Sequence, residues 1–198
     1  MFSRGATRKV GLLGGSFNPA HQGHLDISLA ALSYLGLDEV WWLVAPQNPL
    51  KASAGMAPFA ARLAEARKVA RNPRIVVTDI EAKLGTRFTA DTLRRLQQQF
   101  RAHRFVWLMG ADNLAQLHRW RQWHRIVGAC AIAVFERHPY SHSALAAPAA
   151  EVFAGARLPE ARLAELADAE PPAWAFIRLR PHPASATAIR ARAAQVRG

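Results

Sequence analysis

The 198-residue chain contains a single cysteine, Cys130, so it cannot form an internal disulfide. No apolar run reaches the roughly 18 residues that a membrane span needs. The basic residues at the start are not followed by an apolar stretch of the kind found in signal peptides. Together these absences predict a cytoplasmic protein with no membrane anchor.

Acidic residues are also few, with 14 Asp and Glu against 26 Lys and Arg, which gives a formal net charge of +12. Such an excess favours a polyanionic partner: nucleic acid, an anionic membrane or a phosphate-rich ligand. A genome biased toward arginine codons explains the charge equally well. The positive residues are spread along the chain without a block of five or six, which argues against a nucleic-acid-binding tail. We therefore expect neither nucleic acid nor a membrane as partner.

The order of secondary structure predicts the fold class. Short apolar segments typical of buried strands lie at 9–15, 39–45, 74–78, 104–109 and 129–135. Between them, apolar residues at helical spacing predict helices over 23–35, 58–70 and 90–100. Strands alternating with helices at this spacing predict an α/β fold with a Rossmann-like open, mostly parallel sheet and helices on both faces.

The last third of the chain has a weaker pattern. Residues 144–173 are rich in alanine and proline, and we expect surface helices and connectors there. A last strand is expected over 175–179. We predict one domain over 1–198, in which residues 1–8 are flexible and residues 183–198 form a C-terminal helix.

The most informative segment follows the first predicted strand and reads Gly14-Gly15-Ser16-Phe17-Asn18-Pro19-Ala20-His21-Gln22-Gly23-His24. Glycines allow the backbone to approach a ligand closely, and a helix starting near Gln22 directs free N–H groups toward it. His21 and His24 can present ring N–H donors to one anion. This predicts a phosphate cradle. A metal site is the alternative, but no third ligand lies nearby, and the segment is neither G-x-G-x-x-G nor a P-loop.

This segment resembles the H-x-G-H signature of the nucleotidyltransferase superfamily, and G-x-F-x-P-x-H-x-G-H is similar to its nicotinate-nucleotide adenylyltransferases. Class I aminoacyl-tRNA synthetases carry a related signature, but they are much longer, and this chain has no lysine motif like K-M-S-K-S. The resemblance implies catalytic roles for His21 and His24. It also implies an ATP site lined by Gly14, Gly15, Ser16 and Phe17.

A second segment, Ser185-Ala186-Thr187-Ala188-Ile189-Arg190, is similar to the family's S-S-T-x-I-R motif. The resemblance implies that Ser185 and Thr187 bind ATP and that Arg190 is catalytic. Ala186 replaces the second serine, which puts one hydroxyl contact in doubt. An ordinary capped helix with a surface arginine is the alternative.

Two middle segments extend the resemblance. Phe88–Leu93 is similar to Y-T-x-D-T-L, which implies that Thr89 meets the nicotinate carboxylate. Met109–Asn113, followed by Trp120, is similar to G-x-D-n-x6-W. It implies that Gly110 and Asp112 line the ATP site and that Trp120 stacks on the pyridine ring. Structural alternatives exist, since Trp120 could be a core aromatic and Asp112 could cap a helix.

The remaining implied ATP contacts are Lys51, in the loop after the second predicted strand, and Arg137, after the fifth. Cys130 lies in a predicted strand, where packing is the expected role. The resemblance implies transfer of AMP from ATP to nicotinate mononucleotide, giving nicotinate adenine dinucleotide and pyrophosphate. Mg²⁺ would be carried with ATP, because the sequence shows no carboxylate cluster.

Other functions remain open at this level. A sister adenylyltransferase acting on nicotinamide mononucleotide or pantetheine phosphate is the closest alternative, and a nucleic-acid-binding protein is the alternative from another class. The sequence leaves the oligomeric state open, including a homo-oligomer.

Overall fold

A computed structural model describes residues 8–46, 55–137 and 140–179. At its centre lies a parallel six-stranded sheet with strand order β3-β2-β1-β4-β5-β6. The strands are β1 (Lys9–Gly15), β2 (Glu39–Val44), β3 (Ile75–Thr78), β4 (Arg104–Gly110), β5 (Ala131–Phe135) and β6 (Trp174–Ile177). Their side chains are apolar on both faces, as in parallel sheets covered on two sides. Trp41 and Trp42, neighbours in β2, are both buried, one on each face.

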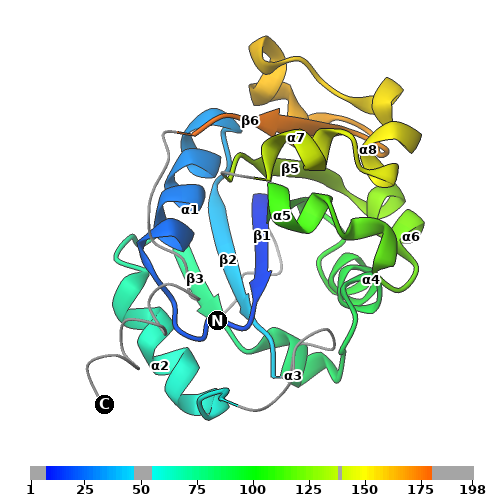
Figure 1. Cartoon of the computed structure of the whole chain (residues 1–198). Helices are drawn as coiled ribbons and strands as arrows, with labels where there is room; N and C mark the ends of the chain where they lie inside the picture. Colours follow the sequence, from blue (N-terminus) through cyan, green and yellow to red (C-terminus); the bar gives the residue numbers. More distant parts are fainter. Residues whose placement is uncertain (1–7, 47–54, 138–139, 180–198) are drawn as a thin grey trace.

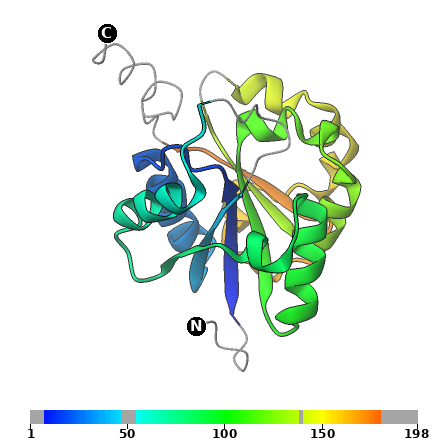
Figure 2. The ribbon, with the colours of Figure 1, turned by 90° about the horizontal axis from the view of Figure 1, so that it is seen from below.

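Helices cover both faces of the sheet (Figures 1 and 2). One face packs against α1 (Gln22–Tyr34), α2 (Phe59–Val69) and the 3-10 segment η3 (Glu160–Asp168). The other face packs against α3 (Ile80–Leu84), α4 (Thr89–Gln99), α5 (Ala111–Leu114), η1 (Leu117–Arg119), α6 (Trp123–Ala129), α7 (Ser141–Leu145) and α8 (Pro148–Val152). A short η2 (Ala154–Ala156) follows α8. The predicted Rossmann-like α/β fold is confirmed.

The predicted boundaries differ from the observed ones mainly before β5. Residues 129–135 were expected to form a strand, but the strand begins at Ala131, because α6 extends to Ala129 and Cys130 follows it. The short α3 and α6 were not predicted, since helices of one to two turns give too little periodicity. Cys130 is buried, as expected for a packing residue, and burial raises the pKa of its thiol to about 12.

The predicted surface helices over 144–173 correspond to several short pieces, from α7 to η3. The predicted helix over 183–198 and most of residues 1–8 lie outside the described residues. Within the described ranges, no helix has the length and apolarity needed to cross a bilayer.

Candidate active site

The candidate site lies where the strand order reverses. β1 pairs with β2 on one side and with β4 on the other, and Leu13 of β1 is in register with Leu108 of β4. The loops that follow β1 and β4 therefore leave the same edge of the sheet side by side. In open α/β sheets this carboxyl edge, at the switch point, is where ligands bind.

The loop after β1 is held in shape by aromatic packing. Phe17 adopts a positive φ of 45°, and its ring is buried, stacked on Trp42 with centroids 5.1 Å apart and tilted against His24 at 4.7 Å. A left-handed conformation is unfavourable for a non-glycine residue, and this packing offsets the strain. A Cβ on Gly14 would lie 2.6 Å from Cη2 of Trp107, so only glycine fits there without displacing the indole.

The two histidines are fixed relative to each other at the start of α1. His21 is the N-cap residue, and its main-chain N–H donates to Nδ1 of His24 at 3.1 Å. The ring centroids lie 3.9 Å apart. Since Nδ1 of His24 accepts this bond, the neutral ring carries its proton on Nε2. The arrangement places two imidazole rings at a helix N-terminus, whose positive dipole end suits an anion.

The start of α1 is also held by Ser28, a residue of the same helix that the sequence did not single out. Its hydroxyl donates to the carbonyl of His24 at 2.8 Å and accepts a hydrogen bond from Nε1 of Trp42 at 2.7 Å. Ser28 is fully buried. Ser28 therefore connects Trp42 of β2 to the first turn of α1 at His24.

Beyond β4, the predicted ATP residues meet at a second position. Arg137, after β5, forms an ion pair with Asp112 of α5 at 3.2 Å. A Cβ on Gly110 would overlap the Asp112 carboxylate, so the glycine allows that carboxylate to fold back toward β4. Gly110 is the N-cap of α5 and Asp112 bonds Arg137, so helix capping does not account for Asp112.

The segments expected to bind the pyridine nucleotide also lie together. Thr89 is the first residue of α4, after Phe88 at the N-cap. The Arg121 guanidinium sits 4.7 Å from the centre of the Phe88 ring, which places the chain after Trp120 beside this helix start. Trp120 is half-buried, with its ring edge-on to Trp107 at a centroid distance of 6.5 Å.

A buried carboxyl lies behind the Thr89 segment. The Thr92 hydroxyl is within hydrogen-bonding distance of the Glu81 carboxyl, at 3.1 Å, and of the Thr86 hydroxyl, at 2.9 Å. Burial raises the pKa of Glu81 to about 7, and the bond from Thr92 opposes the rise. Sequence reasoning missed Glu81, because one glutamate in a short helix carries no pattern. The network ties α3 to the turn that leads into Phe88.

The structure thus gathers most of the predicted site residues at one edge of the sheet. The end of β1, the loop that follows it and the start of α1 contribute Gly14, Gly15, Ser16, Phe17, His21 and His24. The end of β4 contributes Gly110, α5 contributes Asp112 and the chain after β5 contributes Arg137, while Thr89 and Trp120 come from the α4 side. Lys51, Ser185, Thr187 and Arg190 lie outside the described residues. Within the described ranges, no group of three or more His, Cys, Asp or Glu side chains is placed to hold a metal ion.

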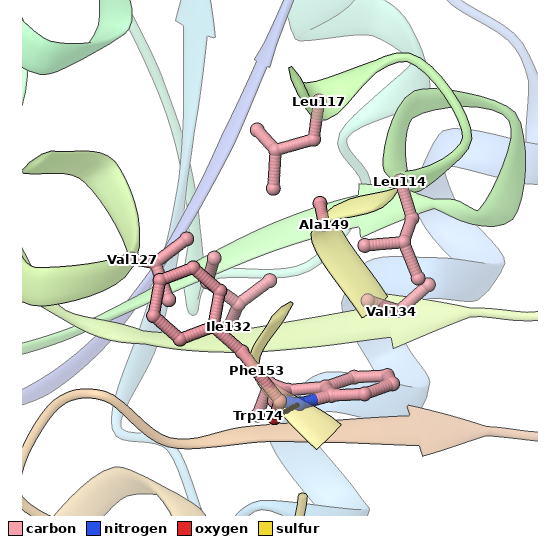
Figure 3. Close-up of a pocket in the computed structure, with 8 residues that line it drawn as sticks. All are labelled: Leu114, Leu117, Val127, Ile132, Val134, Ala149, Phe153 and Trp174. Atoms are coloured by element: carbon pink, nitrogen blue, oxygen red, sulfur yellow. Dashed lines mark hydrogen bonds between the residues drawn. The ribbon is translucent and has the colours of Figure 1, made fainter. Parts of the chain in front are cut away.

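A small pocket elsewhere is part of the core. Figure 3 shows its lining, in which the side chains of Leu114, Val127 and Ile132 face Phe153 and Trp174. Its cavity volume of about 10 Å³ is at the lower limit for one water molecule, and its walls are apolar. The Trp174 indole N–H donates to the carbonyl of Phe153 at 2.7 Å. This is a packing gap and is too small for a nucleotide.

Comparison with known proteins identifies the family of this chain. Residues 12–192 match the model of the cytidylyltransferase-like family. A probable nicotinate-nucleotide adenylyltransferase of Cereibacter sphaeroides is 55% identical over 92% of this chain and 96% of its own length. One from Parvibaculum lavamentivorans is 54% identical over 93% of this chain and 92% of its own. The chain belongs to the nicotinate-nucleotide adenylyltransferases of this family.

Solved structures of this adenylyltransferase family share the fold at low sequence identity. Nicotinic acid mononucleotide adenylyltransferase of Plasmodium falciparum, complexed with APC, superposes with a TM-score of 0.67 at 15% identity, over 93% of this chain and 83% of that one. The same protein complexed with NaAD gives a TM-score of 0.65 at 16% identity, over 92% and 82% of the two chains. Both comparisons support the Rossmann-like architecture.

Proposed function

We propose that this enzyme transfers AMP from ATP to nicotinate mononucleotide, giving nicotinate adenine dinucleotide and pyrophosphate, at the carboxyl edge between β1 and β4. The observation that carries the proposal is the pair His21 and His24 at the start of α1, fixed by the bond between them. It lies at the switch point, beside the strand that leads to Gly110 and Asp112.

The nucleophile brings its own charge. The 5′-phosphate of the mononucleotide is anionic near neutral pH, so no general base is required. One of its oxygens bonds to the α-phosphorus of ATP as the bond from that phosphorus to the bridging oxygen breaks, and pyrophosphate leaves with the electron pair. The enzyme must align two polyanions and stabilise the charge that develops, which is positioning plus electrostatic preorganisation.

We assign the residues of the site to different parts of ATP. We assign His24 Nε2, His21 and the N-terminus of α1 to the ATP phosphates, with the glycines at the end of β1 allowing close approach. Arg137 carries positive charge, partly balanced by Asp112. Lys51 and Arg190 are assigned to the leaving pyrophosphate on the resemblance alone. Mg²⁺ would enter with ATP and neutralise its phosphates, since the described residues hold no cluster of ligands for it.

The mononucleotide is assigned to the α4 side. Trp120 offers an aromatic face for a pyridine ring. The start of α4 at Thr89 offers N–H groups for a carboxylate, an arrangement that a neutral amide satisfies poorly. We therefore assign a preference for nicotinate over nicotinamide mononucleotide.

The test is pyrophosphate release from ATP with each of three acceptors: nicotinate mononucleotide, nicotinamide mononucleotide and pantetheine phosphate. We expect the highest kcat/KM for nicotinate mononucleotide, by about tenfold or more. Equal efficiency with the first two would reject the acid preference. Turnover with pantetheine phosphate alone would reassign the enzyme to a sister reaction.

A further inference from the structure

Arg62, on the inner face of α2, is a buried arginine that the sequence did not single out. It is 2% exposed, and among the described residues its guanidinium donates only to main-chain carbonyls. Nη1 donates to Ser16 at 2.6 Å and to Ala45 at 2.8 Å, Nη2 donates to Pro46 at 2.8 Å, and Nε donates to Ala57 at 3.0 Å. One side chain therefore joins three segments: the loop after β1, the end of β2 and the chain before α2.

The charge of Arg62 has no carboxylate partner within the described part of the chain. Burial lowers the pKa of the guanidinium, but arginine remains protonated at neutral pH. A buried charge is unfavourable unless hydrogen bonds or an opposite charge compensate it. Four carbonyls supply the hydrogen bonds here, and the polyanion bound by the adjoining loop would supply opposite charge.

Asn18 makes a second connection between the same segments. Its side-chain amide donates to the carbonyl of Gly55 at 3.2 Å, and its side-chain oxygen accepts the main-chain N–H of Ala57 at 3.2 Å. Ala57 is thus held by Asn18 through its N–H and by Arg62 through its carbonyl. The loop that leads to His21 is tied at two points to the chain before α2.

We propose that Arg62 is a positioning residue for ATP: it holds the loop between β1 and α1, through Ser16, in the conformation that binds the triphosphate. The proposal rests on the proposed function only in assigning that loop to ATP. Arg62 lies on the α1 and α2 face of the sheet, whereas Thr89 and Trp120 lie on the opposite face. Loss of the Arg62 guanidinium should therefore weaken the binding of ATP and leave the binding of the mononucleotide unchanged.

The test compares Arg62→Lys with Arg67→Lys, a matched change at an exposed arginine of the same helix. Lysine keeps the charge but lacks the planar fork that reaches carbonyls of three segments. We expect Arg62→Lys to raise the KM for ATP about tenfold or more, while the KM for nicotinate mononucleotide stays within about twofold. Arg67→Lys should change neither. An unchanged KM for ATP in a folded Arg62→Lys protein, or an equal rise in both KM values, overturns the proposal.

A second variant covers loss of folding. If circular dichroism shows that Arg62→Lys is unfolded at the assay temperature, Asn18→Ala takes its place, because it removes the other connection to the same loop. The same ATP-selective rise is then expected, and an unaltered KM for ATP overturns the proposal.

Calorimetric titration with a non-hydrolysable ATP analogue separates this proposal from the proposed function. A wild-type protein that binds the analogue but forms no dinucleotide would reject the proposed reaction. The affinity difference between wild type and Arg62→Lys would still decide the role of Arg62.

Discussion

The main-chain N–H of His21 donates a hydrogen bond to Nδ1 of His24 across 3.1 Å. One nitrogen of the His24 ring is therefore used to begin α1, and we assign the other, Nε2, to the ATP phosphates. The two uses can be separated by substitution, because side-chain amides reproduce either nitrogen of the ring.

His24→Asn places an oxygen near the Nδ1 position and should keep the bond from His21, but it removes the Nε2 donor. We expect turnover to fall by roughly 10² to 10³, the usual cost of one preorganised donor to a charged transition state. His24→Gln, whose amide reaches the Nε2 position, should retain more activity than His24→Asn. Steady-state kinetics on variants with matched melting temperatures provide the measurement. Near-normal turnover in His24→Asn would exclude a phosphate-binding role.

Gly110→Ala should displace the Asp112 carboxylate, which occupies the place where the new Cβ would lie. The ion pair with Arg137 would then be lost or rearranged. We expect the KM for ATP to rise about tenfold with a smaller change for the mononucleotide. Gly155→Ala, at a glycine where a Cβ meets nothing within 4 Å, is the matched control. ATP kinetics that are the same in both variants would show that the Asp112 position is unimportant.

Glu81→Gln should change the pH dependence of stability. Burial raises the pKa of Glu81 to about 7 from an ordinary value of 4.5. Between pH 4.5 and pH 7 the folded protein keeps the Glu81 proton, whereas the unfolded chain has released it. The contribution of this proton to the free energy of unfolding is therefore complete below about pH 4.5 and is lost as pH rises through 7. Glutamine stays neutral and can still bond Thr92. Above about pH 8, the free energy of unfolding of the variant should exceed that of wild type by on the order of 3 kcal/mol at most.

Thermal melts at several pH values from about 6 to 8.5 follow this difference. Glu65→Gln, at an exposed glutamate of α2, should show no pH-dependent gain. A constant difference between Glu81→Gln and wild type over the whole range would mean that Glu81 is already ionised in the folded protein at the lower pH.

Trp120→Ala should weaken the binding of nicotinate mononucleotide and leave the binding of ATP unchanged. A stacked ring is worth about 1 kcal/mol or more, so the KM for nicotinate mononucleotide should rise about fivefold to tenfold. Trp120→Phe keeps an aromatic face, so its KM for nicotinate mononucleotide should rise less than that of the alanine variant. Both KM values, measured with each substrate varied in turn, decide the point. If the alanine variant changed only the KM for ATP, the assignment of the two substrates to the two sides of the site would have to be exchanged.

Arg190→Lys tests the part of the site that the sequence alone assigns. Lysine keeps the charge but cannot bond two phosphate oxygens with a planar fork. We expect weaker use of ATP with the mononucleotide KM nearly unchanged, and a larger effect in Arg190→Ala. Unaltered ATP kinetics in the lysine variant would reject a role for the Ser185–Arg190 segment in the reaction.

The sequence predicted the fold because its strands are short, apolar and well separated. The segments at 9–15 and 104–109 match β1 and β4 closely, and the pairing of these strands places the predicted phosphate cradle at the carboxyl edge of the sheet. The error at 129–135 arose because apolar residues at the end of α6 look the same in sequence as the start of a strand.

The supporting residues of the site were beyond sequence reasoning. Arg62 looks like any helical arginine in an arginine-rich chain, and only the folded loops bring Ser16 and Ala45 to its guanidinium. Glu81 and Thr92 are eleven positions apart in two separate helices, so no spacing rule connects them. Motifs identify groups that meet a ligand, whereas the groups that hold those motifs in place are defined by long-range contacts.

Burial of the single cysteine has a practical consequence. Cys130 is 3% exposed, and its thiol stays protonated at ordinary pH, so it should react slowly with maleimides and alkylating agents. A cysteine introduced at an exposed position, such as Val152 on α8, could then be labelled alone without first removing the native one. The wild-type sequence is thus a ready background for attaching a fluorophore or spin label at one chosen position.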